Sequence, residues 1–370
     1  MLPGLCLIHS RDSVELVADL AELTRRFSAF AETASRRAPL YSVLARVVAD
    51  DPALVGVLRA APEEQHNPVL LFVAVHDLLL RGLGPELAAF YPNLAKEPKT
   101  GDVAPAFRSF VSSHADSIRE LVATRKTQTN EVARCSLFLP LLARAYDECG
   151  PLALVEVGAS AGLNLLLAHY AYEYEPGGSV GDESPVRLTC GTRGDPPIPD
   201  AIPLIAASVG LDLSPIDVHD PDQTRWLEAC VWPDQPDRFA RLHACLELAR
   251  RNPPRIVQGD AVNDVVARIE DVAGFGHPVV MNSWVLCYLS EQRQRDYVSE
   301  LHRFGAVHDL SWVVIESPAQ TPGLPIPSDS DDHATALSLV RWRGGARTVE
   351  RLANCHPHGY WMHWNNRDER

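Results

Sequence analysis

The sequence predicts an α/β domain with a mostly parallel sheet, preceded by an all-helical domain. From residue 13 to about residue 150 the apolar positions recur at helical spacing. Residues 152–167 (LALVEVGASAGLNLLL) then indicate a strand buried on both faces, a turn of small residues and a helix that begins near Ala161. Beyond this point strands and helices alternate, which is typical of a parallel sheet covered on both faces. We therefore expect a helical domain or lid over residues 1–149 and an α/β domain over 150–370.

Proline and capping signals divide the helical domain into separate helices. The expected helices cover residues 14–27, 39–49, 51–59, 68–81, 104–123 and 130–148. In the α/β domain the expected strands after the first are 209–215, 255–258, 278–281 and 312–316, with helices at 238–250, 262–271 and 290–304. Two further segments, 347–352 and 359–364, are expected to form an antiparallel pair that closes the sheet.

Composition limits the class of protein. The formal net charge of −14 argues against a broad surface for nucleic acid or anionic lipid, which needs a basic field. No secretory signal is recognised at Met1, and the longest apolar run, 69–75, is too short to span a bilayer. The eight cysteines form no C-x-x-C pair, so we expect no disulfide framework and no bound metal. These observations favour a soluble, cytoplasmic protein, and they do not indicate its oligomeric state.

The turn 158–162 (GASAG) fits more than one kind of site. It matches the G-x-S-x-G nucleophile elbow of α/β-hydrolases, with Ser160 as the nucleophile. With Glu156 before it, the turn also resembles motif I of class I S-adenosylmethionine-dependent methyltransferases, which have a Rossmann-like fold of seven strands with an antiparallel last strand. The resemblance implies cofactor contacts at Glu156, Gly158, Ser160 and Gly162, although Ser160 stands where a glycine is usual. The third alternative is a buried turn whose small residues only allow close packing.

Three later motifs extend this resemblance in chain order. It implies that Asp212 binds the ribose hydroxyls of S-adenosylmethionine, that Asp260 meets the adenine amino group, and that Asn282 lies under the methionine arm. Both aspartates can instead be caps or turn residues. Along the chain, Asp212 also lies farther from motif I than the ribose-binding acid lies from the glycine-rich turn in dinucleotide-type folds. Either 186–190 is an extra strand within an insertion at 172–205, or it is the second strand and Asp212 loses its role.

The substrate side is indicated by two polar stretches, 125–131 (RKTQTNE) and 355–359 (CHPHG). Candidate proton-transfer residues are Glu131 and His356, because a carboxylate or an imidazole can move a proton near neutral pH. The candidate substrate-binding residues are Arg125, Gln128, Asn130 and His358. For the first stretch the alternative is a helix cap at residues 129 and 130. Glu316, at the end of a strand, is a further candidate.

The chain as a whole is similar to a bacterial family of unassigned function that joins a helical N-terminal region to a methyltransferase-like domain. The resulting hypothesis is methyl transfer from S-adenosylmethionine to an unidentified small molecule. One alternative is a binding or regulatory module that keeps the fold without catalysis. Another is a serine hydrolase in which Ser160 acts with Asp331 or Asp332 and with one of the two histidines of the 355–359 stretch.

Overall fold

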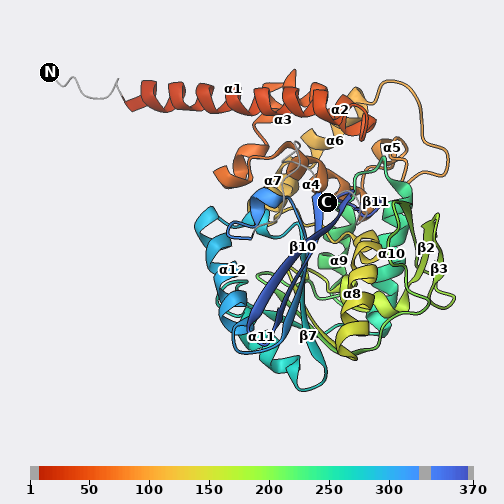
Figure 1. The fold of residues 1–370 in the computed structure, drawn as a ribbon. Coiled ribbons are helices and arrows are strands. Elements are labelled where there is room, and N and C mark those ends of the chain that lie inside the picture. The colour runs from red at the N-terminus through yellow and green to blue at the C-terminus, as the bar shows by residue number, and fades with distance from the viewer. Residues whose placement is uncertain (1–7, 325–334, 366–370) are drawn as a thin grey trace. The chain divides into compact units, whose positions relative to one another are not determined.

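The computed structural model describes the backbone of residues 8–324 and 335–365, and the chain forms two compact units (Figure 1). The helical unit comprises residues 1–129 and 221–240, and the α/β unit comprises residues 130–220 and 241–370. The chain thus leaves the α/β unit after residue 220 and returns to it at residue 241. Helix 135–149, which the sequence analysis grouped with the helical domain, belongs to the α/β unit.

The helices of the helical unit begin mostly where the sequence indicates. They are α1 (Ile8–Ala34), α2 (Pro39–Ala49), α3 (Pro52–Val55), η1 (Leu58–Ala60), η2 (Glu63–Gln65), α4 (Pro68–Leu80), α5 (Pro85–Ala88), α6 (Ala104–Ser113), α7 (Ala115–Thr124) and α9 (Pro221–Ala229). The single helix expected over 104–123 is two helices that meet at His114. Helix α9 was not predicted.

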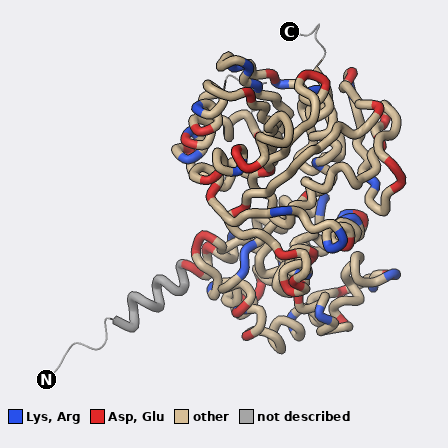
Figure 2. Tube along the Cα trace, turned by 90° about the horizontal axis from the view of Figure 1, so that it is seen from below, with Lys and Arg blue, Asp and Glu red and all other residues tan. Residues whose placement is uncertain are grey.

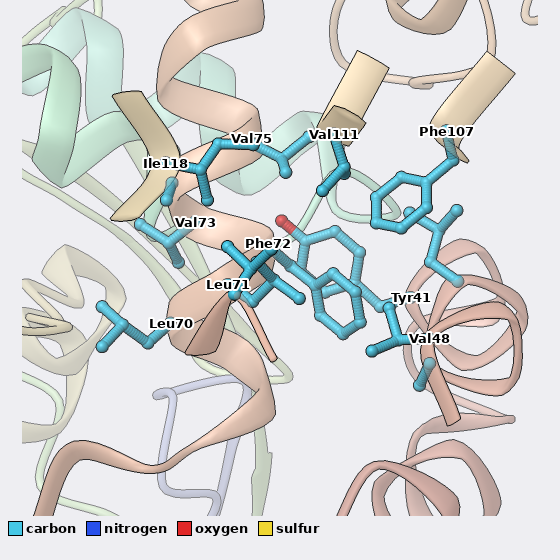
Figure 3. Packing of buried hydrophobic residues seen from close by; sticks show 14 of the residues in the cluster. Tyr41, Val48, Leu70, Leu71, Phe72, Val73, Val75, Phe107, Val111 and Ile118 are labelled. Carbon is cyan, nitrogen blue, oxygen red and sulfur yellow. The ribbon is translucent and has the colours of Figure 1, made fainter. Parts of the chain in front are cut away.

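Helix α4 is the centre of the helical unit. Asn67 caps it by accepting a hydrogen bond from the backbone N–H of Val69, and Pro68 occupies the first turn, where its missing N–H costs nothing. Side chains on every side of α4 are buried, which is typical of a core helix rather than an amphipathic surface helix. Figure 3 shows Phe72 of α4 against Tyr41 of α2, with ring centroids 4.8 Å apart.

The α/β unit consists of one sheet and its covering helices. Its strands are β1 (Leu152–Val157), β2 (Ala171–Glu175), β3 (Gly178–Val180), β4 (Arg187–Arg193), β5 (Ile205–Asp212), β6 (Ile256–Gln258), β7 (His277–Ser283), β8 (Leu310–Glu316), β9 (Thr335–Arg343), β10 (Ala346–Cys355) and β11 (Trp361–Trp364). Its helices are η3 (Val132–Arg134), α8 (Cys135–Cys149), η4 (Leu163–His169), α11 (Val265–Ala273), η5 (Leu286–Tyr288), α12 (Glu291–Gly305) and η6 (Pro318–Gln320). Helix α10 (Pro236–Arg251) begins in the helical unit and ends in this one.

The sheet has the strand order β3-β2-β4-β11-β10-β9-β8-β7-β1-β5-β6. The five strands from β8 to β6 run parallel to one another. Strands β8, β9, β10 and β11 form an antiparallel meander, so the expected antiparallel pair at the C-terminal end is confirmed as β10 and β11. The expectation of seven strands was too low, because β9 and the strands β2, β3 and β4 join the same sheet.

The core of the α/β unit lies between one face of the sheet and helices α11 and α12. Alternate residues of β1, including Val155 and Val157, point into this layer and meet Ile269 of α11. Tyr297 of α12 packs edge-on against Trp312 of β8, with ring centroids 5.6 Å apart. Helix α8 contacts β1 and β8 as well. The central strands are therefore buried, as their nearly continuous apolar sequences predict.

Acidic and basic residues are interspersed along both units (Figure 2). Among the described residues, no helix is long and apolar enough to cross a membrane. Within the same residues, no group of three His, Cys, Asp or Glu side chains is arranged to hold a metal ion.

Candidate functional site

The candidate site lies where the parallel strands of the α/β unit end. From β1 the chain moves to β5 and then β6 on one side, and afterwards to β7 and β8 on the other side of β1. The strand order therefore reverses beside β1. In open α/β sheets ligands bind outside the carboxyl ends of the strands at such a reversal.

The turn after β1 comes close to the loop after β7. Gly158 has a φ of +76°, and a Cβ atom built there would lie 2.3 Å from a Cγ atom of Val285. Ser160 also has a positive φ, of +53°, which is unusual for a residue with a side chain. Gly158 is thus required by the close approach of the two loops, whatever else the turn does.

The expected α-helix from Ala161 is instead the 3₁₀ helix η4, which has seven residues and begins at Leu163. The hydroxyl of Tyr170 donates to the carbonyl of Leu163 at 2.6 Å, and that of Tyr172 donates to the carbonyl of Leu167 at 2.7 Å. These carbonyls are satisfied by side chains rather than by a continuing α-helix. The prediction of an α-helix that begins near Ala161 was therefore wrong.

Strand β5, and not 186–190, pairs with β1, so Asp212 lies at the end of the neighbouring strand. Its Oδ2 atom accepts the backbone N–H of Ser160 at 2.7 Å, and its Oδ1 atom accepts that of Ser214 at 2.8 Å. Residues 187–190 of the segment 186–190 belong to β4, which pairs with β2 and β11. Asp212 therefore ties the turn after β1 to the turn after β5.

Glu156 is buried, with 3% of its surface exposed. Its Oε1 atom accepts a hydrogen bond from Nδ2 of Asn164 at 2.7 Å, and its Oε2 atom is buried with no hydrogen-bond partner among the described residues. Burial raises the pKa of Glu156 to about 8, and the hydrogen bond from Asn164 and the charge of Arg134 offset part of that rise. Burial therefore favours the protonated form of Glu156 at neutral pH.

Ser160 does not have the surroundings of an activated nucleophile. Its Oγ atom is buried and has no hydrogen-bond partner among the described residues, whereas a nucleophilic serine needs a base within hydrogen-bond reach. The proposed acids Asp331 and Asp332 lie outside the described residues. The geometry described here thus offers the hydrolase alternative no serine–histidine pair.

Arg134 of η3 is a central residue of the site that the sequence analysis missed. Its Nε atom donates to the carbonyl of Pro357 at 2.7 Å, and its Nη1 atom donates to the carbonyl of Ser283 at 2.9 Å. Burial raises the pKa of both Glu156 and Glu316, and the charge of the Arg134 guanidinium offsets a small part of each rise. These partners are distant in sequence, and the residue type alone suggested only a helix position.

Glu131 is also buried, and two basic side chains approach it. Nη2 of Arg241 lies 3.5 Å from its Oε1 atom, and Nδ1 of His358 lies 3.3 Å from its Oε2 atom. His356 is arranged differently: its Nδ1 atom accepts the backbone N–H of His358, and its ring stacks on Tyr360. The structure thus places His358, a predicted substrate contact, beside Glu131, one of the two predicted proton-transfer residues.

The segment that carries Glu131 lies against the turn after β1. Nδ2 of Asn130 donates to the carbonyl of Ala159 at 3.1 Å. The Oδ1 atom of Asn130 is buried and has no hydrogen-bond partner in the described part of the chain. Asn130 and Glu131 therefore lie near the turn after β1, where the strand order reverses, as expected for residues of the candidate site.

Asn282 and Glu316 are hydrogen-bonded to each other, and Glu316 also binds the backbone of the loop after β7. Asn282 is fully buried; its Nδ2 atom donates to Oε1 of Glu316 at 2.9 Å, and its Oδ1 atom accepts from Nε1 of Trp312 at 2.6 Å. Oε1 of Glu316 also accepts the backbone N–H groups of Val285 and Leu286. Burial raises the pKa of Glu316. Asn282 thus uses both ends of its amide within the protein.

Asp260 accepts hydrogen bonds within the turn 261–263 that precedes α11, and its contact with the adenine amino group stays a prediction. Its Oδ1 atom accepts the backbone N–H groups of Val262 and Asn263, both at 3.0 Å. It also forms an ion pair with Arg293 of α12. These hydrogen bonds and the cation hold the pKa of Asp260 below its usual range, despite partial burial.

Two of the predicted substrate residues belong to the helical unit. The guanidinium of Arg125 lies over the ring of Trp226, 5.8 Å from its centroid. The backbone N–H of Gln128 donates to Sγ of Cys230 at 3.5 Å. Both therefore have contacts within that unit, and their proposed part in substrate binding stays a prediction.

Comparison with known proteins identifies the family. Residues 24–364 match a family profile described as "Uncharacterized protein conserved in bacteria (DUF2332)". The chain belongs to this family. No curated protein matches it. The match covers most of both units, so the family is defined by the helical unit together with the α/β unit.

The assembled site combines a buried acid, a cation and an acid–histidine pair. The charge of Arg134, in η3, acts on Glu156. Glu131 directly precedes η3 and contacts His358. A buried carboxyl group can hold a cationic ligand or stay protonated, depending on pH. A histidine oriented by a carboxylate can accept a proton. The arrangement can therefore bind a polar, positively charged molecule and assist a proton transfer.

Proposed function

We propose that the α/β unit of this DUF2332 protein binds S-adenosylmethionine at the carboxyl ends of β1, β5 and β7 and transfers its methyl group to a small molecule. In this proposal the parallel strands β6, β5, β1, β7 and β8 correspond to a Rossmann-like, class I methyltransferase-type sheet. The meander β9–β11 and the strands β2, β3 and β4 are additions to that sheet. The reversal of strand order beside β1 supports the proposal.

The observation that carries the proposal is the position of Asp212. Strand β5 lies directly beside β1, and Asp212 ends it, level with the turn that follows β1. Each carboxylate oxygen of Asp212 accepts one backbone N–H, and a carboxylate oxygen can accept a second hydrogen bond. Asp212 thus retains acceptor capacity for the two ribose hydroxyls.

Buried atoms without partners fit the rest of the cofactor. Oε2 of Glu156, Oγ of Ser160 and Oδ1 of Asn130 are acceptors that no described residue satisfies. S-adenosylmethionine carries an ammonium group and a sulfonium centre, both of which suit such acceptors. Nε1 of Trp284 is a buried donor without a partner, which suits the carboxylate of the methionine arm.

Entry of the cofactor requires a local opening. Glu156 and Ser160 are buried, and Asn130 bonds directly to the turn after β1. The segment 130–134 must therefore move away from that turn when the site is filled. Closure of the same segment would then exclude water, which helps to align the acceptor with the methyl group.

The residues of the chain have separate tasks in this mechanism. When bound, S-adenosylmethionine supplies an electrophilic methyl group on a positively charged sulfur. Arg134 holds the loop after β7 and the turn at Pro357 in place through its backbone contacts. Oε2 of Glu131 lies 3.3 Å from Nδ1 of His358, and a carboxylate in this position favours the tautomer that carries its proton on Nδ1 and leaves Nε2 basic. His358 then takes the proton that an acceptor hydroxyl or amine loses.

Calorimetric titration tests the proposal. The wild-type protein should bind S-adenosylmethionine and S-adenosylhomocysteine, and Asp212→Ala should weaken both by at least about tenfold through loss of charge-assisted hydrogen bonds. Asp200→Ala is the matched control, because this exposed aspartate lies outside the site. Circular dichroism verifies that each variant is folded. Failure of the folded wild-type protein to bind either ligand would overturn the proposal.

A further inference from the structure

A second site lies elsewhere on the sheet of the α/β unit. A cavity of about 440 Å³ opens on strands β2, β4 and β11. It is lined by Glu175, Gly191, Thr192, Arg193, Trp361, Met362 and His363. Its volume is in the range of small-molecule sites, about 300–1,000 Å³. None of these residues belongs to the candidate methyl-transfer site.

Gly191 forms the floor of this cavity. In the parallel register, Gly191 of β4 lies beside Trp361 of β11 on one side and beside Glu175 of β2 on the other. Neighbouring strands are about 4.8 Å apart, so the backbones that carry Trp361 and Glu175 are about 10 Å apart. Because Gly191 has no side chain, a hollow remains between an aromatic wall and an acidic wall.

The aromatic wall is exposed although the strands around it are well packed. Trp361 exposes 44% of its surface, whereas the next residue, Met362, exposes 1%. Strand residues alternate between the two faces, so Trp361 and His363 share the open face of β11. A flat ring can therefore stack on the indole of Trp361 above Gly191.

The charges around the hollow are of opposite sign and are not paired with each other. Glu175 and Arg193 are both exposed, and neither forms an ion pair within the described residues. Farther along the same face, Glu173 and Arg187 do form an ion pair, at 2.7 Å. Arg193 lies two residues beyond Gly191 on β4, and Glu175 lies beside Gly191 on β2. An acid and a base that line one hollow without forming an ion pair can bind the two charges of one zwitterion, the base by two parallel hydrogen bonds to a carboxylate.

We propose that this cavity binds a free aromatic amino acid, with its ring on Trp361 above Gly191, its ammonium group toward Glu175 and its carboxylate toward Arg193. The proposal does not depend on methyl transfer, since it uses no residue of the site at β1. It assigns a ligand class to a part of the sheet, β2, β4 and β11, that lies beyond the five parallel strands.

Isothermal titration calorimetry of the full chain with three indole probes tests the charge requirement. L-tryptophan carries both charges, tryptamine lacks the carboxylate, and indole-3-propionate lacks the ammonium group. L-tryptophan should bind at least about tenfold more tightly than either analogue, because each lacks one charge-assisted contact. Equal affinity for the three probes would overturn the proposal, and so would no binding of L-tryptophan by folded protein.

Variants test the location of the site. Gly191→Val should fill the hollow and abolish binding; a Cβ at this position meets its neighbours only at 3.6 Å or more, so the fold tolerates it. Trp361→Ala and Arg193→Gln should each weaken L-tryptophan binding by about tenfold. Glu173→Gln is the control, because its partner is Arg187, and it should bind like the wild type. Unchanged affinity in Gly191→Val and Trp361→Ala would contradict the assignment.

Discussion

The Oε2 atom of Glu131 lies 3.3 Å from Nδ1 of His358, and the carboxylate is almost completely buried between that ring and Arg241. The pair joins the η3 segment, near the start of the α/β unit, to the turn between β10 and β11. A buried carboxylate needs such partners, because the desolvation of one buried ion costs on the order of several kcal/mol. The contact therefore holds two chain segments of the candidate site together.

Replacing Glu131 should destabilise the α/β unit. Glu131→Gln removes the charge that Arg241 and His358 face. We expect the free energy of unfolding to fall by about 1–3 kcal/mol. This is less than the loss of a fully buried ion pair would cost, because Arg241 and His358 are both partly exposed. Urea unfolding measures it. Glu291→Gln breaks an exposed ion pair with Arg295 and should change stability by less than about 0.5 kcal/mol. Equal effects of the two substitutions would contradict the structural role of Glu131.

Glu156 predicts a pH dependence of stability. Its pKa is raised by burial to about 8 in the folded protein, above the ordinary value of 4.5. Between these values the unfolded chain has lost the proton that the folded chain keeps, so this group makes the folded state less stable as pH rises, by about 1 kcal/mol per pH unit. Glu156→Gln mimics the protonated form and removes the effect.

Urea unfolding at several pH values between 5 and 8 measures this difference. The variant should gain stability relative to the wild type as pH rises through that window, and the two should converge near pH 4. Parallel stability profiles for the two proteins would show that Glu156 ionises in the folded state as it does in the unfolded chain.

The turn 355–359 depends on a glycine. Gly359 has a φ of +77°, and a Cβ atom there would lie 2.2 Å from the carbonyl oxygen of Ala133. Gly359→Ala should therefore cost about 2–4 kcal/mol, more than the φ penalty alone. Gly178→Ala is the control, since Gly178 has a φ of +95° in open space and should lose only about 1 kcal/mol. If both variants unfold at the same urea concentration, the backbone of Gly359 does not approach the carbonyl oxygen of Ala133 as closely as described.

Two tyrosines in the helical unit are expected to tolerate loss of their hydroxyls. The hydroxyls of Tyr41 and Tyr91 are buried and have no hydrogen-bond partner among the described residues. Tyr41→Phe and Tyr91→Phe should leave the melting temperature unchanged or raise it, because a buried polar group without a partner destabilises the fold. Tyr170→Phe is the control: its hydroxyl donates to Leu163, and its loss should cost about 1 kcal/mol. A comparable drop in all three would indicate bound water at Tyr41 and Tyr91.

Local sequence patterns predicted the elements whose shape depends on nearby residues. Helix α2 and the capped start of α4 follow from proline and asparagine at their first positions, and β1, β7 and β8 follow from nearly continuous apolar runs. Strand β9 was missed because it is buried on both faces yet contains polar residues, such as Ser338, that interrupt the apolar run. Its burial depends on β8 and β10, which a local pattern does not show.

The candidate site was only partly predictable for the same reason. Asp212 was named as a candidate because its segment resembles the second strand of class I methyltransferases, and Glu131 because it stands in a polar stretch. Arg134 was missed because its partners are carbonyls 149 and 223 residues away in the chain. The contact of Glu131 with His358 depends on how the 355–359 turn folds back on Ala133, which the sequence does not specify.

Hydrogen–deuterium exchange of the full chain, with and without saturating S-adenosylmethionine, tests the central claim most directly. The account predicts slower exchange of the backbone amides in 157–164, 212–216 and 283–286, with strands β2 and β3 unchanged. Both the binding and its position at the carboxyl ends of β1, β5 and β7 would then be established. Unchanged exchange in all three segments, or protection confined to other parts of the chain, would contradict it.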